Sequence, residues 1–464
     1  MHRREFLKKA AALAGAAFVE NSLDRTAAQA QAPPLPNVLF ILCDQWRAQA
    51  LSSAGDPNVR APNVDAMAAA GARLTHCYSN SPLCTPCRSM LMSGRYPTRT
   101  NCFVNDVLMP LEEYCVAEAF RDAGYSTGYI GKWHLDGDPK PGYVEPGPHR
   151  QGWDYWAAFN RGHDYFSGVY YEDSPTPISV PSGKFEPDHQ TDLAINWIAG
   201  RVGETAPWFL TVSFGPPHTP YRAPQAYMDL FDPAALILRP NVSGDVTQAR
   251  TDLRGYYALI KNLDDNIGRL LQCLSDNGLA DDTVVVLTAD HGDMHYSQGQ
   301  VHKSKPWEES IGVPFIVRWP GGLSAGRVVD SLFASIDIHP TLCGLCGVPI
   351  PPGKDGADYS HLLRGLPGPE RQSVYLTIGL PSAASAWRGV RTAQYTYAWK
   401  GGVSGAPWVL YDNFADPYQM NNLAADPGSQ ALRDQLHYLL RQWVQDVGDS
   451  FFGPPSGVEN WRTY

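Results

Sequence analysis

The chain has 464 residues, of which 44% are hydrophobic and 18% are charged, and its formal net charge is -10. A chain of this length exceeds one small core, so we expect a large domain and a smaller one. The acidic balance and the lack of a long basic segment argue against a nucleic acid partner.

The N-terminal segment 1–32 has the composition of an export signal. Arg3 and Arg4 precede Phe6 and Leu7, an Ala-rich apolar stretch follows, and "RTAAQAQAPP" offers small-residue cleavage sites. The segment resembles a twin-arginine signal peptide, which implies the Tat export machinery as a partner and a periplasmic or secreted mature protein. The apolar stretch is shorter than the roughly 20 residues of a membrane span, so we expect no stable span. An ordinary amphipathic helix is the alternative interpretation.

Apolar strands alternate with helices through the segment 33–352, which we predict to be the larger domain. This pattern predicts an α/β fold, with a large and mostly parallel sheet sandwiched by helices. The expected strands lie within 37–44, 116–134, 207–221, 281–293 and 313–320, and the expected helices are 61–72, the start of 116–134, and 256–274.

Two regions depart from this alternation. Residues 142–173 are aromatic, rich in Gly and Pro and weakly periodic, and we interpret them as an insertion over the sheet edge that forms a pocket wall. Its aromatic residues either pack the insertion or stack on a sugar or aryl group; they are Tyr155, Trp156, Tyr165, Tyr170 and Tyr171. In 353–464, short strand patterns precede a helix, which predicts a smaller C-terminal α+β domain with an antiparallel sheet.

Polar side chains follow the predicted strands at the points where the strands end. Ligands gather beyond the C-terminal ends of strands in parallel sheets, and strands built only for packing would not require this arrangement. The residues are Asp44, Lys132, His134, His218, Asp290 and His291.

The nine cysteines do not form the scaffold of a small disulfide protein. Cys343 and Cys346 lie in an apolar helical pattern, and we expect them to be buried. In "CTPCRSMLMSGR", Thr85 fits a helix cap and Pro86 a first helical position, so that Cys84 would precede a helix N-terminus with Arg88 one turn inside. Such a place suits an anion, a nucleophile or a redox pair of cysteines.

The pattern C-x-P-x-R followed by "GRYPTR" resembles the signature of the sulfatase family, in which the first cysteine is oxidised to formylglycine. The segments "NVLFILCDQWR", "GYIGKWHL", "GPPHTPY", "LTADHGD", "KSKPWEES" and "LYDNFADPYQMNNL" follow in the order that the family has. The resemblance covers the mature chain and implies an alkaline phosphatase-like fold and hydrolysis of sulfate esters.

The resemblance also implies a divalent metal, most often Ca²⁺, held by Asp44, Gln45, Asp290 and His291 with the formylglycine oxygen of Cys84. Many relatives have Asp in place of Gln45 and Asn in place of His291. An imidazole nitrogen suits Mn²⁺ or Zn²⁺ better than Ca²⁺, so the metal stays open. The same departure occurs in hydrolases of phosphonate monoesters and phosphodiesters.

The implied reaction begins with the hydrated aldehyde at Cys84, whose ionised oxygen, favoured by the metal and Arg88, attacks sulfur. Lys132 and Lys303 would neutralise the sulfate oxygens. His218, together with Lys303, would protonate the leaving alcohol, and His134 would take the proton that releases sulfate. Maturation would need the formylglycine-generating enzyme, and the substrate would be a small-molecule or oligosaccharide sulfate ester.

Three alternatives remain at this point. The first is a phosphonate monoester or phosphodiester hydrolase with the same modified cysteine. The second is a metal- or carbohydrate-binding protein with unmodified Cys84, and the third is a dithiol redox protein using Cys84 and Cys87. Asp293 is expected to order its loop rather than bind metal. His295, His302 and His339 are expected to be structural residues or residues at the rim of the site.

Overall fold

The computed structural model describes residues 35–453, so the predicted export signal lies outside the described residues. Its main sheet has eight strands. Their bounds are β1 (Asn37–Asp44), β2 (Ala72–Tyr78), β3 (Ser126–Lys132), β4 (Tyr155–Phe159), β7 (Trp208–Pro217), β8 (Thr283–Ala289), β9 (Phe315–Arg318) and β10 (Arg327–Ala334).

The strand order in this sheet is β10-β2-β9-β8-β1-β7-β3-β4. Strand β9 is antiparallel to both of its neighbours, and the other neighbouring pairs are parallel. Strands β1, β7 and β8 are completely buried apart from the first residue of β1. Continuous burial explains their uninterrupted apolar sequences, because helices cover both faces of a parallel sheet. The predicted mostly parallel sheet is therefore confirmed.

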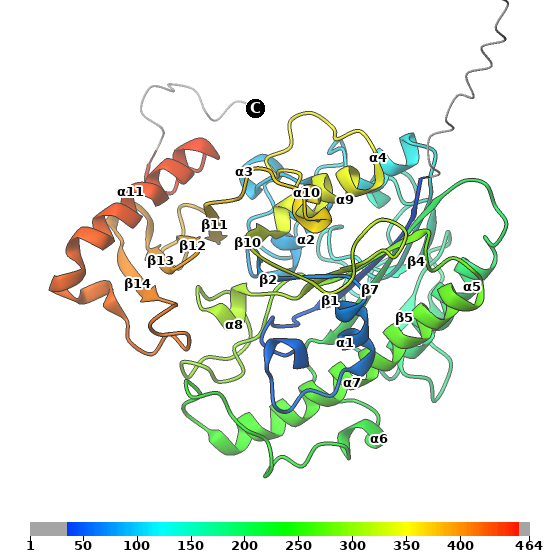
Figure 1. Ribbon diagram of the computed structural model, residues 1–464, viewed down its shortest axis with the longest axis horizontal. Helices are drawn as coiled ribbons and strands as arrows, with labels where there is room; N and C mark the ends of the chain where they lie inside the picture. Colours follow the sequence, from blue (N-terminus) through cyan, green and yellow to red (C-terminus); the bar gives the residue numbers. More distant parts are fainter. Residues whose placement is uncertain (1–34, 454–464) are drawn as a thin grey trace, which may run out of the picture. The chain divides into compact units, whose positions relative to one another are not determined.

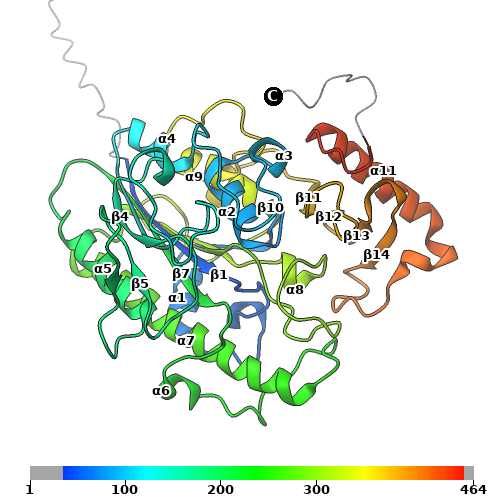
Figure 2. The same ribbon diagram turned by 180° about the vertical axis from the view of Figure 1, so that it is seen from behind.

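Helices lie on both faces of the sheet (Figures 1 and 2). One face carries the long amphipathic helix α7 (Val246–Asp276) with α1 (Pro62–Ala69), α5 (Glu186–Ala199) and α6 (Gln225–Met228) packed against it. The other face carries a second group whose members contact one another, namely α2 (Cys84–Ser93), α4 (Val116–Asp122), α9 (Ile338–Cys346) and α10 (Ser360–Arg364). Short helices α3 (Pro97–Thr100) and α8 (Glu308–Ile311) complete this part.

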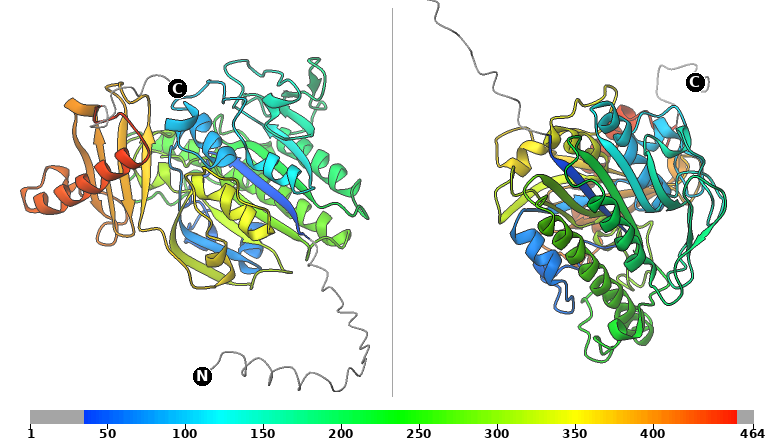
Figure 3. Two further views of the ribbon diagram at one scale, coloured as in Figure 1. Left: turned by 90° about the horizontal axis from the view of Figure 1, so that it is seen from above. Right: turned by 90° about the vertical axis from the view of Figure 1, so that its right-hand side faces the viewer.

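The C-terminal part contains the predicted antiparallel sheet, in the order β11-β12-β13-β14 (Figure 3). The strands are β11 (Ser373–Ile378), β12 (Trp387–Thr392), β13 (Tyr395–Lys400) and β14 (Ala406–Asp412), and helix α11 (Gln430–Asp446) follows. Its core includes Tyr375 and Leu436 together with Met90 from α2. The chain from Pro36 onward forms one compact unit because this core is shared with the larger part.

The interpretation of 142–173 as an insertion over the sheet was incomplete. The segment supplies β4, which pairs in parallel with β3 and forms an edge of the main sheet. It also supplies β5 (Val169–Tyr170), which pairs with β6 (Ile178–Ser179). Five residues of β4 are too few for a clear period between Gly- and Pro-rich flanks. Strands β2 and β10 were not predicted either, because charged and polar residues interrupt both apolar patterns.

The predicted start of the helix after Cys84 was wrong by two residues. Helix α2 begins at Cys84 itself, and its N-cap, Leu83, provides no side-chain cap. The Thr85 N–H in the first turn donates instead to Asn105 Oδ1 at 3.0 Å. Thr85 therefore does not cap the helix; its hydroxyl donates to the backbone oxygen of His134 at 2.9 Å. A proline is tolerated at the third helical position of Pro86 because the first turn needs no intrahelical donor. Among residues 35–453, no helix combines the length and apolarity needed to cross a membrane.

Candidate active site

The predicted polar residues meet beyond one edge of the main sheet. Asp44 ends β1, Lys132 ends β3, and Asp290 and His291 directly follow β8. The C-terminal ends of these parallel strands lie side by side, since β1 pairs with both β7 and β8. Cys84 reaches the same place from the first residue of α2. Segments separated by more than two hundred residues in the sequence thus form one cluster.

Cys84 lies at the centre of this cluster, and only 2% of its surface is exposed. Its Sγ is 3.4 Å from His291 Nε2 and 3.3 Å from Lys303 Nζ. The two carboxylate oxygens of Asp44 lie at 3.8 and 3.9 Å. Because Cys84 is the first residue of α2, the positive end of the helix dipole also faces this position.

Arg88 is fully buried one turn further along α2. Its Nε donates to Asp290 Oδ2 at 2.9 Å, and its Nη1 donates to the backbone oxygen of Lys132 and to Ser213 Oγ, both at 2.9 Å. Its Nη2 lies 3.6 Å from Asp44 Oδ2 and has no hydrogen-bond partner among the described residues. Arg88 therefore joins α2 to the ends of β1, β3 and β8 and fixes the two carboxylates.

Two lysines surround Cys84 with positive charge. Lys132 Nζ forms an ion pair with Asp44, and Lys303 Nζ donates to Gln45 Oε1 at 2.9 Å. Burial alone would raise the pKa of Asp44, but Lys132 and further cations hold it well below its ordinary value. Burial and Asp44 raise the pKa of the Cys84 thiol, yet Lys132, Lys303 and His291 outweigh them and lower it well below its ordinary value. The position therefore favours a negatively charged atom.

Gln45 follows β1 in a left-handed conformation with φ of 71°. Its side-chain Nε2 donates to Oδ2 of the buried Asp293, which leaves the side-chain Oε1 directed to Lys303. Asp293 also accepts a hydrogen bond from the backbone N–H of His295 at 3.0 Å. The carboxylate of Asp293 thus orients the side chain of Gln45 and orders its own loop.

Four side chains of the cluster have the donor set of a divalent metal site. One ligand atom each from Asp44, Cys84, Asp290 and His291 lies within 4.8 Å of the other three, and all four residues are buried. His291 Nδ1 donates to the backbone oxygen of Gly292 at 3.0 Å, which leaves the Nε2 lone pair facing carboxylate oxygens of Asp44 and Asp290, each at 3.5 Å. Facing lone pairs repel one another unless a cation or a proton lies between them, so these residues fit a metal ion.

His134 follows β3 and is held by Asp106. Its Nε2 donates to Asp106 Oδ1 at 2.7 Å, and the other carboxylate oxygen of Asp106 accepts a hydrogen bond from Arg161 Nη1 at 2.8 Å. His134 and Asp106 both have positive φ, 62° and 66°, which is uncommon outside glycine and is found at functional sites. His134 Nδ1 is buried without a partner among the described residues and is available to accept a proton.

His218 follows β7 and stacks on His163, with ring centroids 3.7 Å apart and an angle of 7°. Its Nδ1 donates to the backbone oxygen of Thr219 at 2.7 Å. Burial, reinforced by Lys303, lowers the pKa of His218 to about 3. The imidazole is therefore neutral in this structure, and the Nε2 lone pair is free to accept a hydrogen bond.

A cavity of about 150 Å³ lies above Cys84 and brings the remaining predicted residues together. His134, His218 and Lys303 line it, and so do Lys140 and Arg161. The structure thus brings every predicted site residue into this cavity or into the cluster beneath it. These residues are Asp44, Gln45, Cys84, Arg88, Lys132, His134, His218, Asp290, His291 and Lys303.

Sequence reasoning missed Asp106, Arg161 and His163. They lie in loops outside the matching segments, and the only signal for Arg161 and His163 was their place in the predicted pocket wall. The aromatic residues of that wall mainly pack the core: Trp156 stacks on Tyr129, and neither Trp156 nor Tyr165 is more than 2% exposed. None of the five predicted aromatic residues lines the cavity above Cys84.

The other cysteines are buried, and none of those described is in a disulfide. Burial raises the pKa of Cys87 to about 12, whereas the pKa of Cys84 is lowered. A redox pair would need Cys87 to ionise in exchange with Cys84, so this structure does not favour a dithiol role. Cys343 and Cys346 are buried in α9, as predicted.

Comparison with known proteins identifies relatives across almost the whole chain. The family model described as Sulfatase matches residues 36–348, and the model described as N-sulphoglucosamine sulphohydrolase, C-terminal, matches residues 298–446. An ulvan-active sulfatase from Formosa agariphila is 39% identical over 92% of this chain and 84% of its own length. An endo-4-O-sulfatase from Bacteroides thetaiotaomicron is 30% identical, over 90% of this chain and 93% of its own.

A solved structure from Bacteroides fragilis that carries the sulfatase name YidJ has the same fold. Its TM-score is 0.84 at 29% identity, and the alignment covers 90% of this chain and 97% of that chain. The agreement includes both the main sheet and the C-terminal part, because so little of either chain stays unaligned.

Proposed function

The chain belongs to the sulfatase family and is an enzyme that hydrolyses sulfate esters, and we propose that its substrate is a sulfated carbohydrate. The observation that carries the hydrolytic function is the position of Cys84, which lies at a helix N-terminus between two lysines and a metal-type donor set. Such a site binds an anionic ester and a nucleophile together. The relatives active on ulvan and with endo-4-O-sulfatase activity support a carbohydrate as the alcohol.

We propose that Cys84 is oxidised to formylglycine by a formylglycine-generating enzyme. The hydrated aldehyde would supply two hydroxyls on one carbon, one to attack sulfur and one to let the sulfated adduct break down by elimination. The residues around position 84 suit that group, because Lys303 and Lys132 favour an ionised oxygen there as they favour a thiolate.

We propose that Asp44, Gln45, Asp290 and His291 hold one divalent cation, with Ca²⁺ as the first candidate and Mn²⁺ or Zn²⁺ as alternatives. When bound, the cation would act as a Lewis acid and favour ionisation of an oxygen at position 84. Asp293 contributes by fixing the Gln45 amide, and Arg88 by fixing Asp290. The hard oxygen ligands suit Ca²⁺, and the His291 nitrogen suits the two alternatives.

The remaining residues serve the ester and the protons. Lys132 and Lys303 would neutralise the sulfate oxygens as negative charge builds on them. His134, oriented by Asp106, would accept the proton whose loss releases sulfate. His218 must gain a proton before it can protonate the leaving alcohol, and the charge of a bound sulfate next to it raises its pKa toward that role. Lys303 would act with His218 in protonating the leaving alcohol.

We further propose that the protein is exported through a twin-arginine signal and works in the periplasm or outside the cell. The support is the Arg3–Arg4 pair followed by a short apolar segment. A fusion of residues 1–32 to a reporter that functions only after export would test this proposal, with Arg3→Lys and Arg4→Lys together as the control that blocks it.

The proposed function is tested by mass and turnover on one preparation. The enzyme is co-produced with a formylglycine-generating enzyme, and the peptide spanning residues 84–88 is measured for an aldehyde in place of the thiol. Sulfate release is then compared between sulfated saccharides, 4-nitrophenyl sulfate and a phosphate diester of 4-nitrophenol. Sulfate release that follows the aldehyde fraction supports the proposal. An active preparation with an intact thiol would overturn the mechanism, and faster diester cleavage would overturn the substrate class.

A further inference from the structure

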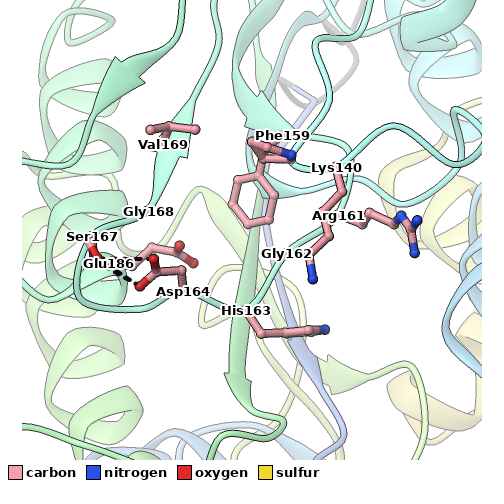
Figure 4. A pocket seen from close by; sticks show the side chains of 11 residues that line it. Lys140, Phe159, Arg161, Gly162, His163, Asp164, Ser167, Gly168, Val169 and Glu186 are labelled. Carbon is pink, nitrogen blue, oxygen red and sulfur yellow. Dashed lines mark hydrogen bonds between the residues drawn. The ribbon is translucent and has the colours of Figure 1, made fainter.

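A second cavity, of about 350 Å³, borders the one above Cys84. Figure 4 shows the side chains that line this second cavity. The two cavities share part of their lining, namely Lys140, Arg161, Gly162 and His163. Since these residues border both, a ligand whose sulfate lies over Cys84 can extend past His163 into the second cavity. A volume at the lower end of the range for small-molecule sites fits one or two sugar rings.

One end of the second cavity carries Glu186, which is only 3% exposed. Gln190 Nε2 donates to its Oε1 at 3.1 Å, and no cation lies within ion-pair distance of the carboxyl among the described residues. Gly168 leaves room there, because a Cβ at that position would lie 2.7 Å from Glu186 Oε2. Burial raises the pKa of Glu186 to about 8. A neutral carboxyl both donates and accepts, as a sugar hydroxyl does. Asp164 lines the same end and accepts hydrogen bonds from the Ser167 N–H and hydroxyl, so this end favours hydroxyls over an anionic group.

The opposite end carries two cations (Figure 4). Arg161 uses its Nε on the backbone oxygen of Asp138 and its Nη1 on Asp106, so Nη2 stays available. Lys140 is exposed and forms no ion pair with any of residues 35–453. The ester sulfate already has Lys132 and Lys303, so these cations exceed what one sulfate requires. In a protein of net charge -10, they are a local attraction for a second anionic group.

We propose that this second cavity binds a saccharide unit that carries its own negative charge, a carboxylate or a second sulfate, in addition to the ester that is cleaved. Glu186 binds hydroxyls of that unit, and Lys140 with Arg161 binds its anionic group. Phe159 lies between the two ends, where an aromatic ring packs against the apolar face of a sugar (Figure 4). This inference rests on the proposed function and specifies its substrate.

The test compares substrates within each enzyme variant. The substrates are 4-nitrophenyl sulfate, a monosulfated neutral disaccharide, the same disaccharide with a uronate, and the same disaccharide with a second sulfate. For Lys140→Ala, we expect kcat/KM on the charged disaccharides to fall about tenfold relative to the neutral one. For Glu186→Leu, we expect kcat/KM on all disaccharides to fall about tenfold relative to the aryl sulfate, with Glu186→Gln in between. The charged disaccharide that is more affected by Lys140→Ala identifies the anionic group.

The control variant is Lys400→Ala, which removes a lysine from β13 in the C-terminal sheet and should shift neither ratio. The inference would be overturned if wild type, Lys140→Ala and Glu186→Leu had the same ratio of kcat/KM between charged and neutral disaccharides and the same ratio between disaccharides and the aryl sulfate. If no sulfate ester is hydrolysed, the proposed function fails, and titration calorimetry with the uronate disaccharide and with the disulfated disaccharide tests the cavity by itself. There, about tenfold weaker binding by both variants supports the inference and equal binding overturns it.

Discussion

Asp106 Oδ1 accepts a hydrogen bond from His134 Nε2 at 2.7 Å, and the second oxygen of the same carboxylate accepts one from Arg161 at 2.8 Å. Thr85, the residue after Cys84, holds both His134 and Asp106. Its hydroxyl donates to the backbone oxygen of His134 and accepts a hydrogen bond from the backbone N–H of Asp106. This carboxylate therefore connects the segment that carries the nucleophile, the proposed base and the cationic end of the second cavity. The sequence alone does not predict the contact between Asp106 and His134.

We expect Asp106→Asn to lower kcat about a hundredfold, with a smaller change in KM, since the charge that stabilises a protonated His134 is lost while the shape is kept. Steady-state kinetics on 4-nitrophenyl sulfate measure both constants. Asp173→Asn is the matched control, because Asp173 pairs with Arg150 at 2.6 Å outside the site. A kcat equal to that of Asp173→Asn would show that Asp106 does not position His134.

Arg88 is the site residue whose removal should cost the most stability. Breaking a fully buried pair leaves Asp290 without its cation, so we expect Arg88→Ala to lower the free energy of unfolding by about 3–5 kcal/mol. Urea unfolding measures this cost, and Arg88→Lys, which keeps the charge without the planar fork, should retain more stability but little activity.

Arg388→Lys is the control for that experiment, because Arg388 is equally buried and pairs with Asp449 in the C-terminal part. It should lose stability while the remaining folded enzyme keeps its turnover. If Arg88→Lys and Arg388→Lys retained the same activity, the assignment of Arg88 to the site would be wrong.

Metal dependence can be measured separately from turnover. We expect one divalent cation per chain by elemental analysis, and its removal by a chelator should lower the melting temperature, since an ion bound only to the folded state stabilises it by linkage. Asp290→Asn should abolish the bound metal, whereas Asp337→Asn, which changes a carboxylate equally buried beside Arg371, should retain it. His291→Asn replaces nitrogen with oxygen and should shift preference from Mn²⁺ toward Ca²⁺. Equal metal content in all variants would contradict the ligand set.

His339 is expected to make stability depend on pH far from the site. Its Nδ1 donates to the backbone oxygen of Met92 at 2.9 Å, and burial, aided by Lys354, lowers its pKa to about 3. The unfolded chain, with a pKa of about 6.5, binds more protons between these values. Stability is therefore complete above the unfolded pKa and falls by up to about 1.4 kcal/mol per pH unit as pH decreases toward the folded pKa.

The measurement for His339 is urea unfolding of wild type and His339→Gln from pH 7 to about 4. The variant lacks this titration, so its stability should fall less steeply than that of wild type. His361→Gln, a change of a partly exposed histidine on α10, should keep the wild-type slope. Parallel curves for wild type and His339→Gln would refute the prediction.

The buried strands and the polar residues that end them could be predicted because both depend on local signals. A buried strand such as β1 needs a continuous apolar sequence, and the residue that ends it, Asp44, follows directly. The order of segments around Cys84 and Lys303 matched a known family, which placed residues that no single pattern could bring together. Strand β4 and residue His163 had no such signal, because a short edge strand shows little period and a loop histidine acquires its partner only through tertiary packing.

The link from the C-terminal sheet to Lys303 was equally hidden from the sequence. Trp387 on β12 is 1% exposed and donates its Nε1–H to the backbone oxygen of Ser304 at 3.0 Å, while the Ser304 N–H donates to Pro82 at 3.0 Å. Ser304 has a φ of 68° and follows Lys303 directly. The C-terminal part therefore fixes the loop whose lysine reaches Cys84.

We expect Trp387→Phe to lower kcat/KM about tenfold, because it removes one hydrogen bond of roughly 1–1.5 kcal/mol from the Lys303 loop without emptying the core. Trp399→Phe is the matched control: it removes an indole hydrogen bond of similar length, 2.8 Å to the backbone oxygen of Gly402, in the same sheet and away from Lys303. Both variants should lose similar stability in urea unfolding, and only Trp387→Phe should lose turnover. If the two variants had equal kcat/KM, the sheet would support the fold without positioning the lysine.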